Sequence, residues 1–311
     1  MNLQQLEYIT ALDTHRHFGK AAAHCFVAQA TLSMMIKKLE EELGVVLFDR
    51  SRAPIVPTEA GVQVIAQARA TLREAAQIPQ LAREMRSGVQ GELRVGIIPT
   101  LAPYLLPLFL PGFLKDYPQV HLRITEQTTA QQLHLLATDA LDVGIMATPL
   151  AAPGMKETPL FREPFRVFVA NDDKSLRKKF LLPEDLDVNQ LWLLEEGHCL
   201  RSQVLNLCEL QQRQARAQNL DYEAGSIESL INITEMNGGI TILPELATRR
   251  LSPEHRERLR AFRPPVPARE ISLVTYRHFV KKKLLEVFEK AICASVAPIL
   301  GKDKGSEVIP L

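Results

Sequence analysis

The sequence has little cysteine, no excess of either charge and no long hydrophobic run, and each shortage excludes a class of protein. Its four cysteines, at positions 25, 199, 208 and 293, form neither a secreted disulfide framework nor a paired C-x-x-C zinc signature. No stretch approaches the roughly 20 consecutive apolar residues that a membrane-spanning helix requires. The N-terminal residues also lack the basic segment and apolar run of a signal peptide. We therefore expect a cytoplasmic protein with reduced thiols and no membrane partner.

Charge is almost balanced, with 37 Lys and Arg against 36 Asp and Glu, so bulk charge favours neither nucleic acid nor membrane as a partner. The hydrophobic fraction of 46% is typical of a soluble globular protein. At about 150 residues per domain, a chain of 311 residues is expected to form two folded units. Apart from His198, the histidines show no metal-binding spacing, and we expect neither a metal nor a cofactor.

The first sixty residues predict three short helices followed by a small hairpin. Apolar residues recur at helical spacing from residue 32 to residue 43, and Gly44 stands where a helix-terminating glycine belongs. Short strands are predicted on either side of the turn-forming segment 50–54. This order of elements predicts a winged helix-turn-helix over residues 1–58.

An alanine-rich, polar segment follows and predicts one long helix from Glu59 to about Met85, with Thr58 as its N-cap. Pro79 is expected to kink or divide this helix, because proline removes a backbone donor and clashes one turn back. An apolar stripe runs along the segment. We interpret residues 59–88 as a linker helix that pairs with another copy of itself.

From residue 92 onward, short apolar runs alternate with helical patterns. Strands are predicted at 93–98, 120–124, 143–146, 166–169, 191–194, 240–243 and 271–276, and helices at 104–117, 129–138, 200–214, 227–236 and 284–296. This alternation is typical of an α/β fold with largely parallel strands. Periodicity alone leaves open whether the region forms one sheet or two lobes.

A helix-turn-helix presents the start of its second helix to base edges and phosphates in the major groove. The side chains expected to contact DNA are Gln29, Ala30, Thr31, Ser33, Lys37, Lys38, Arg50 and Arg52. Residues 1–60 nevertheless hold six cations against seven anions, so the segment lacks the basic excess of many DNA-binding domains. A helical dimerisation module is the alternative interpretation.

The order of motifs in this region resembles the DNA-binding domain of LysR-type transcriptional regulators. The matching segments are FGKAA at 18–22, VAQATLS at 27–33, KLEEELGV at 38–45, LF at 47–48 and PTEAG at 57–61. The resemblance implies double-stranded DNA as partner and an effector domain at 89–303 that is similar to periplasmic binding proteins. That domain would consist of two α/β subdomains, about 89–162 with 267–303 and about 163–266, leaving 304–311 as a C-terminal tail. The resemblance also implies a homodimer that assembles into a homotetramer and, if the protein is an activator, contact with RNA polymerase.

Cys199 and Cys208 lie nine positions apart in a segment with helical character. At the N-terminal edge of a helix, unpaired backbone donors and the helix dipole favour the thiolate of Cys199. A thiolate attacks peroxide to give a sulfenic acid, which a second thiol captures as a disulfide. Nine helical residues rise about 13.5 Å, whereas a disulfide needs Cα atoms within about 7 Å, so oxidation would have to unwind the helix. The alternative is that both thiols pack as small hydrophobic side chains.

A second set of motifs resembles the peroxide-sensing members of the same family. It comprises Pro99 and Thr100 with the segment PYLLP at 103–107, and LEEGHC at 194–199 with Cys208. The resemblance implies that Cys199 is the peroxidatic cysteine and Cys208 the resolving cysteine. It also implies that Thr100, Thr129 and His198 line the peroxide pocket.

Ser202 and Arg269 also belong to the expected peroxide site, whereas Cys25 and Cys293 do not. Ser202 stands where the peroxide-sensing proteins often have an aspartate, and its hydroxyl could serve the same purpose. Arg269 could lower the pKa of Cys199 if the fold brings them together, although an arginine at a strand edge is more often solvated. Cys25 and Cys293 lie on apolar helix faces and are expected in the core.

Three functions from different classes follow from these observations. The leading hypothesis is a DNA-binding transcription factor, not an enzyme, that peroxide switches through a Cys199–Cys208 disulfide. The second is a LysR-type regulator that senses a small organic ligand in a cleft between two lobes. The third is a thiol peroxidase or a solute-binding protein, neither of which needs a helix-turn-helix.

Overall fold

The computed structural model describes residues 1–87, 89–170, 180–208, 222–276, 281–301 and 305–311. The chain forms two compact units, which divide between Gly88 and Val89. This division agrees with the two folded units expected from the length of the chain.

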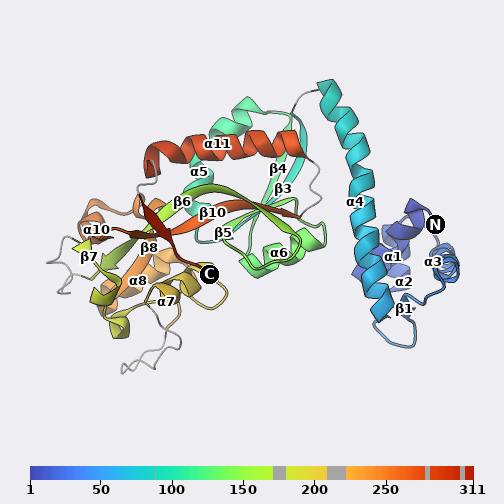
Figure 1. Ribbon diagram of the computed structural model, residues 1–311, viewed down its shortest axis with the longest axis horizontal. Coiled ribbons are helices and arrows are strands. Elements are labelled where there is room, and N and C mark those ends of the chain that lie inside the picture. Colours follow the sequence, from blue (N-terminus) through green and yellow to red (C-terminus); the bar gives the residue numbers. More distant parts are fainter. Residues whose placement is uncertain (88, 171–179, 209–221, 277–280, 302–304) are drawn as a thin grey trace. The chain divides into compact units, whose positions relative to one another are not determined.

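The N-terminal unit is a winged helix-turn-helix with a long helix attached (Figure 1). Its elements are α1 (Leu3–His15), α2 (Phe18–His24), α3 (Gln29–Leu43), β1 (Phe48–Asp49), β2 (Val56–Pro57) and α4 (Glu59–Ser87). The two strands pair antiparallel and form the wing. The helices share one core, which includes Leu6, Ile9, Leu12, Ile36 and Leu39. This core confirms the helical spacing seen in the sequence.

Two caps define the ends of the helices in this unit. Gly44 ends α3 with a φ of 69°, a left-handed conformation that glycine adopts without steric cost. The Thr58 hydroxyl accepts a hydrogen bond of 2.9 Å from the Gly61 amide and caps α4 as predicted. Pro79 does not divide α4, which is one helix from Glu59 to Ser87. One missing backbone bond does not end the helix, because its alanine, glutamine and arginine residues favour helix on both sides.

The C-terminal unit is built around a nine-stranded mixed sheet in the order β4-β3-β5-β10-β6-β9-β7, with β11 beside β10 and β8 beside β6. The first lobe contains β3 (Gly91–Ile97), α5 (Ala102–Asp116), β4 (Val120–Glu126), α6 (Thr129–Ala137), β5 (Val143–Thr148), β10 (Val266–Tyr276) and α11 (Lys282–Leu300). In Figure 1, α5 and α11 cover one face of this sheet and α6 the other. Strands β3, β4 and β5 are parallel, whereas β10 is antiparallel to β5.

The long strand β6 (Met155–Val169) joins the two lobes. Its Pro164 pairs with Ala268 of β10, whereas its next residue, Phe165, pairs with Pro244 of β8. The second lobe contains β7 (Phe180–Leu181), α7 (Cys199–Leu207), α8 (Ile227–Asn237), β8 (Ile240–Pro244), α9 (Glu245–Thr248), α10 (Pro253–Glu257) and β9 (Leu259–Phe262), with 3-10 turns at Pro183–Asp185 and Val188–Gln190. The region is therefore a two-lobed α/β structure, the architecture that the family resemblance implies.

Four details differ from the sequence-based expectation. The strand predicted at 191–194 is reduced to two isolated bridges, from Leu191 to Ile240 of β8 and from Leu194 to Ala224. The sheet is less parallel than expected, because β10 runs antiparallel to β5 and β6, and β6 also runs antiparallel to β8 and β9. The expected C-terminal tail contains β11 (Ser306–Val308), which pairs in parallel with β10. The predicted helix 200–214 is observed as α7 up to Leu207, and residues 209–221 lie outside the described residues.

Candidate functional site

Cys199 is the first residue of α7 and is buried. Gly197, with a φ of 97°, turns the chain into the helix, and His198 occupies the N-cap position without a capping side-chain hydrogen bond. The free amides of the first helical turn are therefore not taken up by an N-cap side chain. The sulfur thus lies at the positive end of α7, as the sequence predicts.

Four groups from separate parts of the C-terminal unit act on the Cys199 sulfur. The Arg269 cation of β10, the Thr129 hydroxyl of α6, and the backbone of Leu200 and Ala147 all favour its thiolate. Burial has the larger, opposite effect, and the pKa of Cys199 is raised above its ordinary value. The thiolate character expected from the helix position is therefore wrong for the reduced protein. The polar groups that would stabilise a thiolate are nevertheless in place around it.

Arg269 is fully buried, which excludes the alternative of a solvated arginine at the strand edge. Its guanidinium contacts a carboxylate oxygen of Glu163 at 2.8 Å and donates to the hydroxyl of Thr100 at 3.0 Å and to the Thr100 carbonyl at 3.2 Å. The second carboxylate oxygen of Glu163 accepts a bond of 2.8 Å from the Leu246 amide. These contacts compensate the buried charge and fix the guanidinium in one orientation.

The other residues of the expected peroxide site differ in their positions. The Thr129 hydroxyl is buried, and among the described residues it has no hydrogen-bond partner apart from the Cys199 thiol on which it acts. His198 is buried, and its Nε2 lies 3.6 Å from a carboxylate oxygen of Glu195. Ser202 is exposed on α7 and is not among the groups that act on the Cys199 thiol. The fold therefore brings Thr100, Thr129 and Arg269 together, but not Ser202.

Cys208 lies at the opposite end of α7, as its C-cap, and its thiol is free. Its backbone amide bonds the Val204 carbonyl at 3.1 Å, so the helical pattern is unbroken from one cysteine to the other. Burial raises the pKa of Cys208 to about 11. Two cysteines at the ends of one continuous helix cannot form a disulfide without opening that helix.

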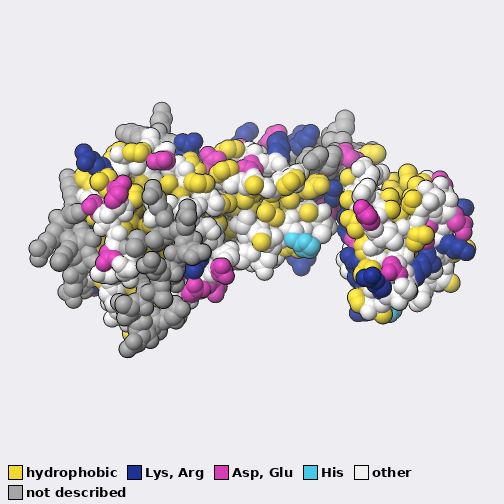
Figure 2. All heavy atoms as spheres, turned by 60° about the horizontal axis from the view of Figure 1, so that its bottom comes forward, with side chains coloured by type: hydrophobic (Ala, Val, Ile, Leu, Met, Phe, Trp, Pro, Cys, Tyr) yellow, Lys and Arg dark blue, Asp and Glu magenta, His cyan; other side chains and the backbone are white. Residues whose placement is uncertain are grey.

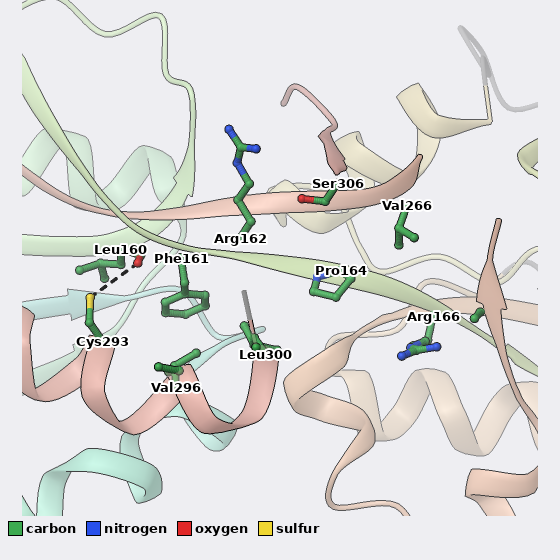
Figure 3. A pocket seen from close by; sticks show the side chains of 13 residues that line it. Leu160, Phe161, Arg162, Pro164, Arg166, Val266, Cys293, Val296, Leu300 and Ser306 are labelled. Atoms are coloured by element: carbon green, nitrogen blue, oxygen red, sulfur yellow. Dashed lines mark hydrogen bonds between the residues drawn. The ribbon is translucent and has the colours of Figure 1, made fainter. Parts of the chain in front are cut away.

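Cys25 and Cys293 are half-buried rather than fully enclosed in a core. Figure 3 shows Cys293 with its sulfur directed at the Leu160 carbonyl, 3.6 Å away, at the wall of a hollow of about 780 Å³ beside α11. Arg162 and Arg166 also line that hollow, and each pairs with a carboxylate, Glu270 and Glu245 respectively. This hollow does not include the residues around Cys199.

The side chains expected to contact DNA lie mostly on one face of α3. Gln29, Ala30, Thr31, Lys37 and Lys38 are exposed and Ser33 is half-buried. Arg52 extends from the wing and pairs with Asp49 at 3.1 Å. On the face drawn in Figure 2, Lys and Arg side chains of this unit are mixed with carboxylates, in keeping with the balanced charge of the segment.

Arg50 has a different environment from the other expected DNA contacts. It bonds Glu40 at 2.6 Å and lies over the Phe18 ring. The second Glu40 oxygen accepts from the amides of Leu47 and Phe48, so Glu40 and Arg50 attach the wing to α3. The exposed apolar side chains of Phe26 and Met34 lie next to the same face and were missed by the sequence analysis. Met34 lies outside the apolar spacing of Leu32, Ile36 and Leu39, and that phase is the signal that could have revealed its exposure.

The described part of the chain contains neither a metal-binding cluster nor a membrane-spanning helix. No three histidine, cysteine, aspartate or glutamate side chains in these ranges lie close enough together to hold a metal ion. Likewise, among the described residues, no helix is both long and apolar enough to cross a membrane.

Two family signatures match the chain. The bacterial regulatory helix-turn-helix protein signature of the lysR family matches residues 3–62, and the LysR substrate binding domain matches residues 86–294. The chain belongs to the LysR family. It is therefore a DNA-binding transcriptional regulator, and the helical dimerisation module is no longer needed as an alternative.

Several relatives of this LysR-family regulator carry names that refer to hydrogen peroxide. The hydrogen peroxide-inducible genes activator of Dickeya chrysanthemi is 38% identical over 280 residues, which cover 88% of this chain and 89% of that protein. The DNA-binding transcriptional dual regulator OxyR of Escherichia coli is 36% identical over 277 residues, which cover 88% and 89% of the two chains.

Solved structures of OxyR proteins are also similar to this chain. A full-length OxyR variant from Pseudomonas aeruginosa is 34% identical and matches with a TM-score of 0.74, covering 94% of this chain and 98% of its own. A peroxide-bound OxyR mutant from Corynebacterium glutamicum is 30% identical and matches with a TM-score of 0.63, covering 96% and 94%.

Proposed function

We propose that this LysR-family regulator senses hydrogen peroxide through Cys199 and that a reversible Cys199–Cys208 disulfide switches its action on DNA. The observation that carries the proposal is the placement of Cys199 at the N-terminus of α7, with Arg269 and Thr129 acting on its sulfur and Cys208 at the other end of the helix. The names of the relatives, which include peroxide-inducible activators and OxyR, support the same substrate.

In the first step, the sulfur of Cys199 attacks one oxygen of the peroxide. The O–O bond breaks, the sulfur is oxidised to a sulfenic acid, and the departing hydroxide takes up the thiol proton and leaves as water. The Arg269 cation stabilises the thiolate in this step, and the otherwise unpartnered Thr129 hydroxyl bonds a peroxide oxygen. Thr100 acts through Arg269, whose guanidinium it holds, and the buried His198 directly precedes Cys199 in the chain.

In the second step, the Cys208 sulfur attacks the oxidised sulfur of Cys199. The S–S bond forms, the S–O bond breaks, and the hydroxide leaves as water with the Cys208 proton. Because α7 is continuous between the two cysteines, this step requires the helix to unwind. Formation of the disulfide thereby changes the conformation of the second lobe, and this change constitutes the redox switch.

The output of this switch is binding to double-stranded DNA through α3 and the wing. We propose that α4 pairs with a second copy and that two such homodimers form the homotetramer, with RNA polymerase as a further partner if the protein is an activator. In such a tetramer, a conformational change in the second lobe of each chain alters the spacing between the DNA-binding units.

The proposal is tested by mass spectrometry of tryptic peptides before and after a brief, low dose of hydrogen peroxide. The expected product is a peptide pair joined through Cys199 and Cys208, and a thiol reductant should reverse it. Peroxide consumption should stop after stoichiometric oxidation, because the chain turns over only when a reductant regenerates the thiols. Continued catalytic consumption would indicate a thiol peroxidase instead, and the absence of the joined peptides would reject the disulfide switch.

A further inference from the structure

The turn between α2 and α3 exposes an aromatic ring on an unfavourable backbone. Phe26 is 95% exposed and has a φ of 56°, a left-handed conformation that is unusual for a bulky side chain. The turn is held by bonds from the Phe26 amide to the Ala23 carbonyl at 3.2 Å and from the Val27 amide to the Ala22 carbonyl at 3.0 Å. Because the ring is almost fully exposed, it is available for a contact outside the chain.

Met34 adds a second exposed apolar side chain on the recognition helix. It is 62% exposed and lies within the face that carries the expected DNA contacts. Ala30 is one turn before it, and Lys37 and Lys38 are one turn after it. Any duplex bound along this face by the two lysines therefore meets the Met34 thioether as well.

We propose that Phe26 and Met34 read thymine 5-methyl groups in the major groove. The thymine methyl is the one apolar group that base pairs present there, and alanine and phenylalanine side chains are among its usual partners. Methionine is flexible and polarisable, so it adapts to a methyl group at the centre of the helix face. The proposal rests on α3 being the helix that faces DNA. Operator recognition then depends on contacts with thymine methyl groups as well as on hydrogen bonds.

The test replaces thymine by uracil, which lacks the methyl group but keeps the same hydrogen-bonding atoms. The full-length protein first selects a duplex from a random pool, and each thymine of that duplex is then replaced in turn. The unaltered protein should lose about fourfold in affinity for each methyl that it contacts. In the Phe26→Ala variant, replacement of the thymine that Phe26 contacts should no longer lower affinity, and the same should hold for Met34→Ala at a different thymine. Leu3 is an exposed residue of α1, and Leu3→Ala should leave every uracil effect unchanged.

Two outcomes would overturn this readout. Equal binding of thymine and uracil duplexes by the unaltered protein would show that no methyl is read. A uracil effect that survives in both variants would assign the methyl contact to other side chains. Thermal unfolding of the variants provides the folding control, because both side chains are exposed and their removal should not lower Tm. Failure to select any duplex would instead contradict the DNA-facing assignment itself.

A separate set of contacts ties the C-terminal segment to the helix that carries both cysteines. Strand β11 pairs with β10, and the Ile309 amide donates to the Ala268 carbonyl at 2.9 Å. The next two carbonyls, of Ile309 and Pro310, accept bonds of 3.0 Å from Gln203 and 3.2 Å from Asn206 of α7. The Gln203 side chain is fully buried. Residues 306–310 therefore connect the strand of Arg269 to the second half of α7.

We infer that residues 306–310 are a clasp that holds α7 helical in the reduced protein. This inference rests on the proposed peroxide switch, because the second step requires α7 to unwind. Unwinding removes Gln203 and Asn206 from the positions in which they reach the clasp. The clasp therefore slows disulfide formation without affecting the first oxidation of Cys199, and it sets the dose of peroxide that completes the switch.

Hydrogen exchange in the reduced protein tests the clasp without any peroxide. Removal of residues 309–311, or Asn206→Ala, should raise exchange of the α7 amides about tenfold, the effect of losing one or two hydrogen bonds. Asn237→Ala is the matched control, because the Asn237 side-chain amide donates to the Ile233 carbonyl of its own helix, α8, at 3.3 Å. Unchanged α7 exchange in both clasp variants would overturn the inference.

Peroxide kinetics then separates the clasp from the proposed function. The clasp variants should form the sulfenic acid of Cys199 at the normal rate and the disulfide several-fold faster. If both steps accelerate equally, the segment acts on the whole site and is not a clasp. If the unaltered chain forms no disulfide, the peroxide switch fails, while the exchange result still decides whether residues 306–310 hold α7.

Discussion

Replacing Arg269 by methionine is expected to destabilise the C-terminal unit and to slow the reaction of Cys199. The Arg269–Glu163 pair has a 2.8 Å contact, and both side chains are fully buried. Removal of one member leaves the other charge buried and unpaired, which costs about 3–5 kcal/mol of unfolding free energy. Glu163→Gln should cost a similar amount, because it leaves the Arg269 cation without its counter-charge.

The two substitutions should have opposite effects on Cys199. The Arg269 cation lowers the pKa of the Cys199 thiol, while the Glu163 carboxylate compensates that cation. Arg269→Met therefore raises this pKa further, and each unit of increase lowers the thiolate fraction at neutral pH about tenfold. Glu163→Gln leaves the cation uncompensated and should speed the reaction. The Arg269→Met/Glu163→Gln double variant should recover most of the lost stability, because it buries no charge.

Urea unfolding measures the stability, and alkylation of Cys199 by iodoacetamide, followed by mass spectrometry, measures its reactivity across pH. Arg94→Met is the control, because Arg94 pairs with Asp142 at 2.9 Å in the same unit but is not among the groups that act on Cys199. It should lower stability without changing the alkylation rate. Equal slowing by Arg269→Met and Glu163→Gln would refute the electrostatic argument and reduce Arg269 to a packing role.

Further expectations concern the two thiols and the DNA-binding face. Cys199→Ser should abolish the peroxide response, whereas Cys208→Ser should consume one equivalent and stop at the sulfenic acid; a disulfide in either variant would contradict these roles. Because burial raises the pKa of Cys208 to about 11, its alkylation should keep accelerating up to that pH, beyond the range of an exposed thiol. Arg52→Ala should reduce the slope of log affinity against log salt by about 0.9, whereas Arg50→Ala should instead destabilise the wing; an unchanged slope would remove Arg52 from the interface. Thr31→Ala should weaken binding to the operator more than to unrelated DNA, and equal losses would indicate a backbone contact.

The sequence alone determined the elements whose signals are local. The apolar spacing of Leu32, Ile36 and Leu39 predicts α3, and Thr58 and Gly44 mark helix ends, because caps and helical periodicity depend on neighbours within one or two turns. The position of Cys199 at the start of a helix is predictable for the same reason. The order of motifs also indicated the family, since motif order is a property of the chain itself.

Only the tertiary structure decided how distant segments meet. Arg269 and Glu163 are separated by 106 positions, and nothing near Arg269 in the sequence indicates that its charge is compensated inside the protein. Strand β11 and its bonds to Gln203 and Asn206 were likewise hidden, because a three-residue strand has too little periodicity to be recognised. The pKa of Cys199 also depends on contacts between distant segments. Its helix position is local and favours the thiolate. The groups that meet at its sulfur come from β5, α6 and β10, far away in the sequence, and desolvation by burial at this meeting point outweighs the local effect.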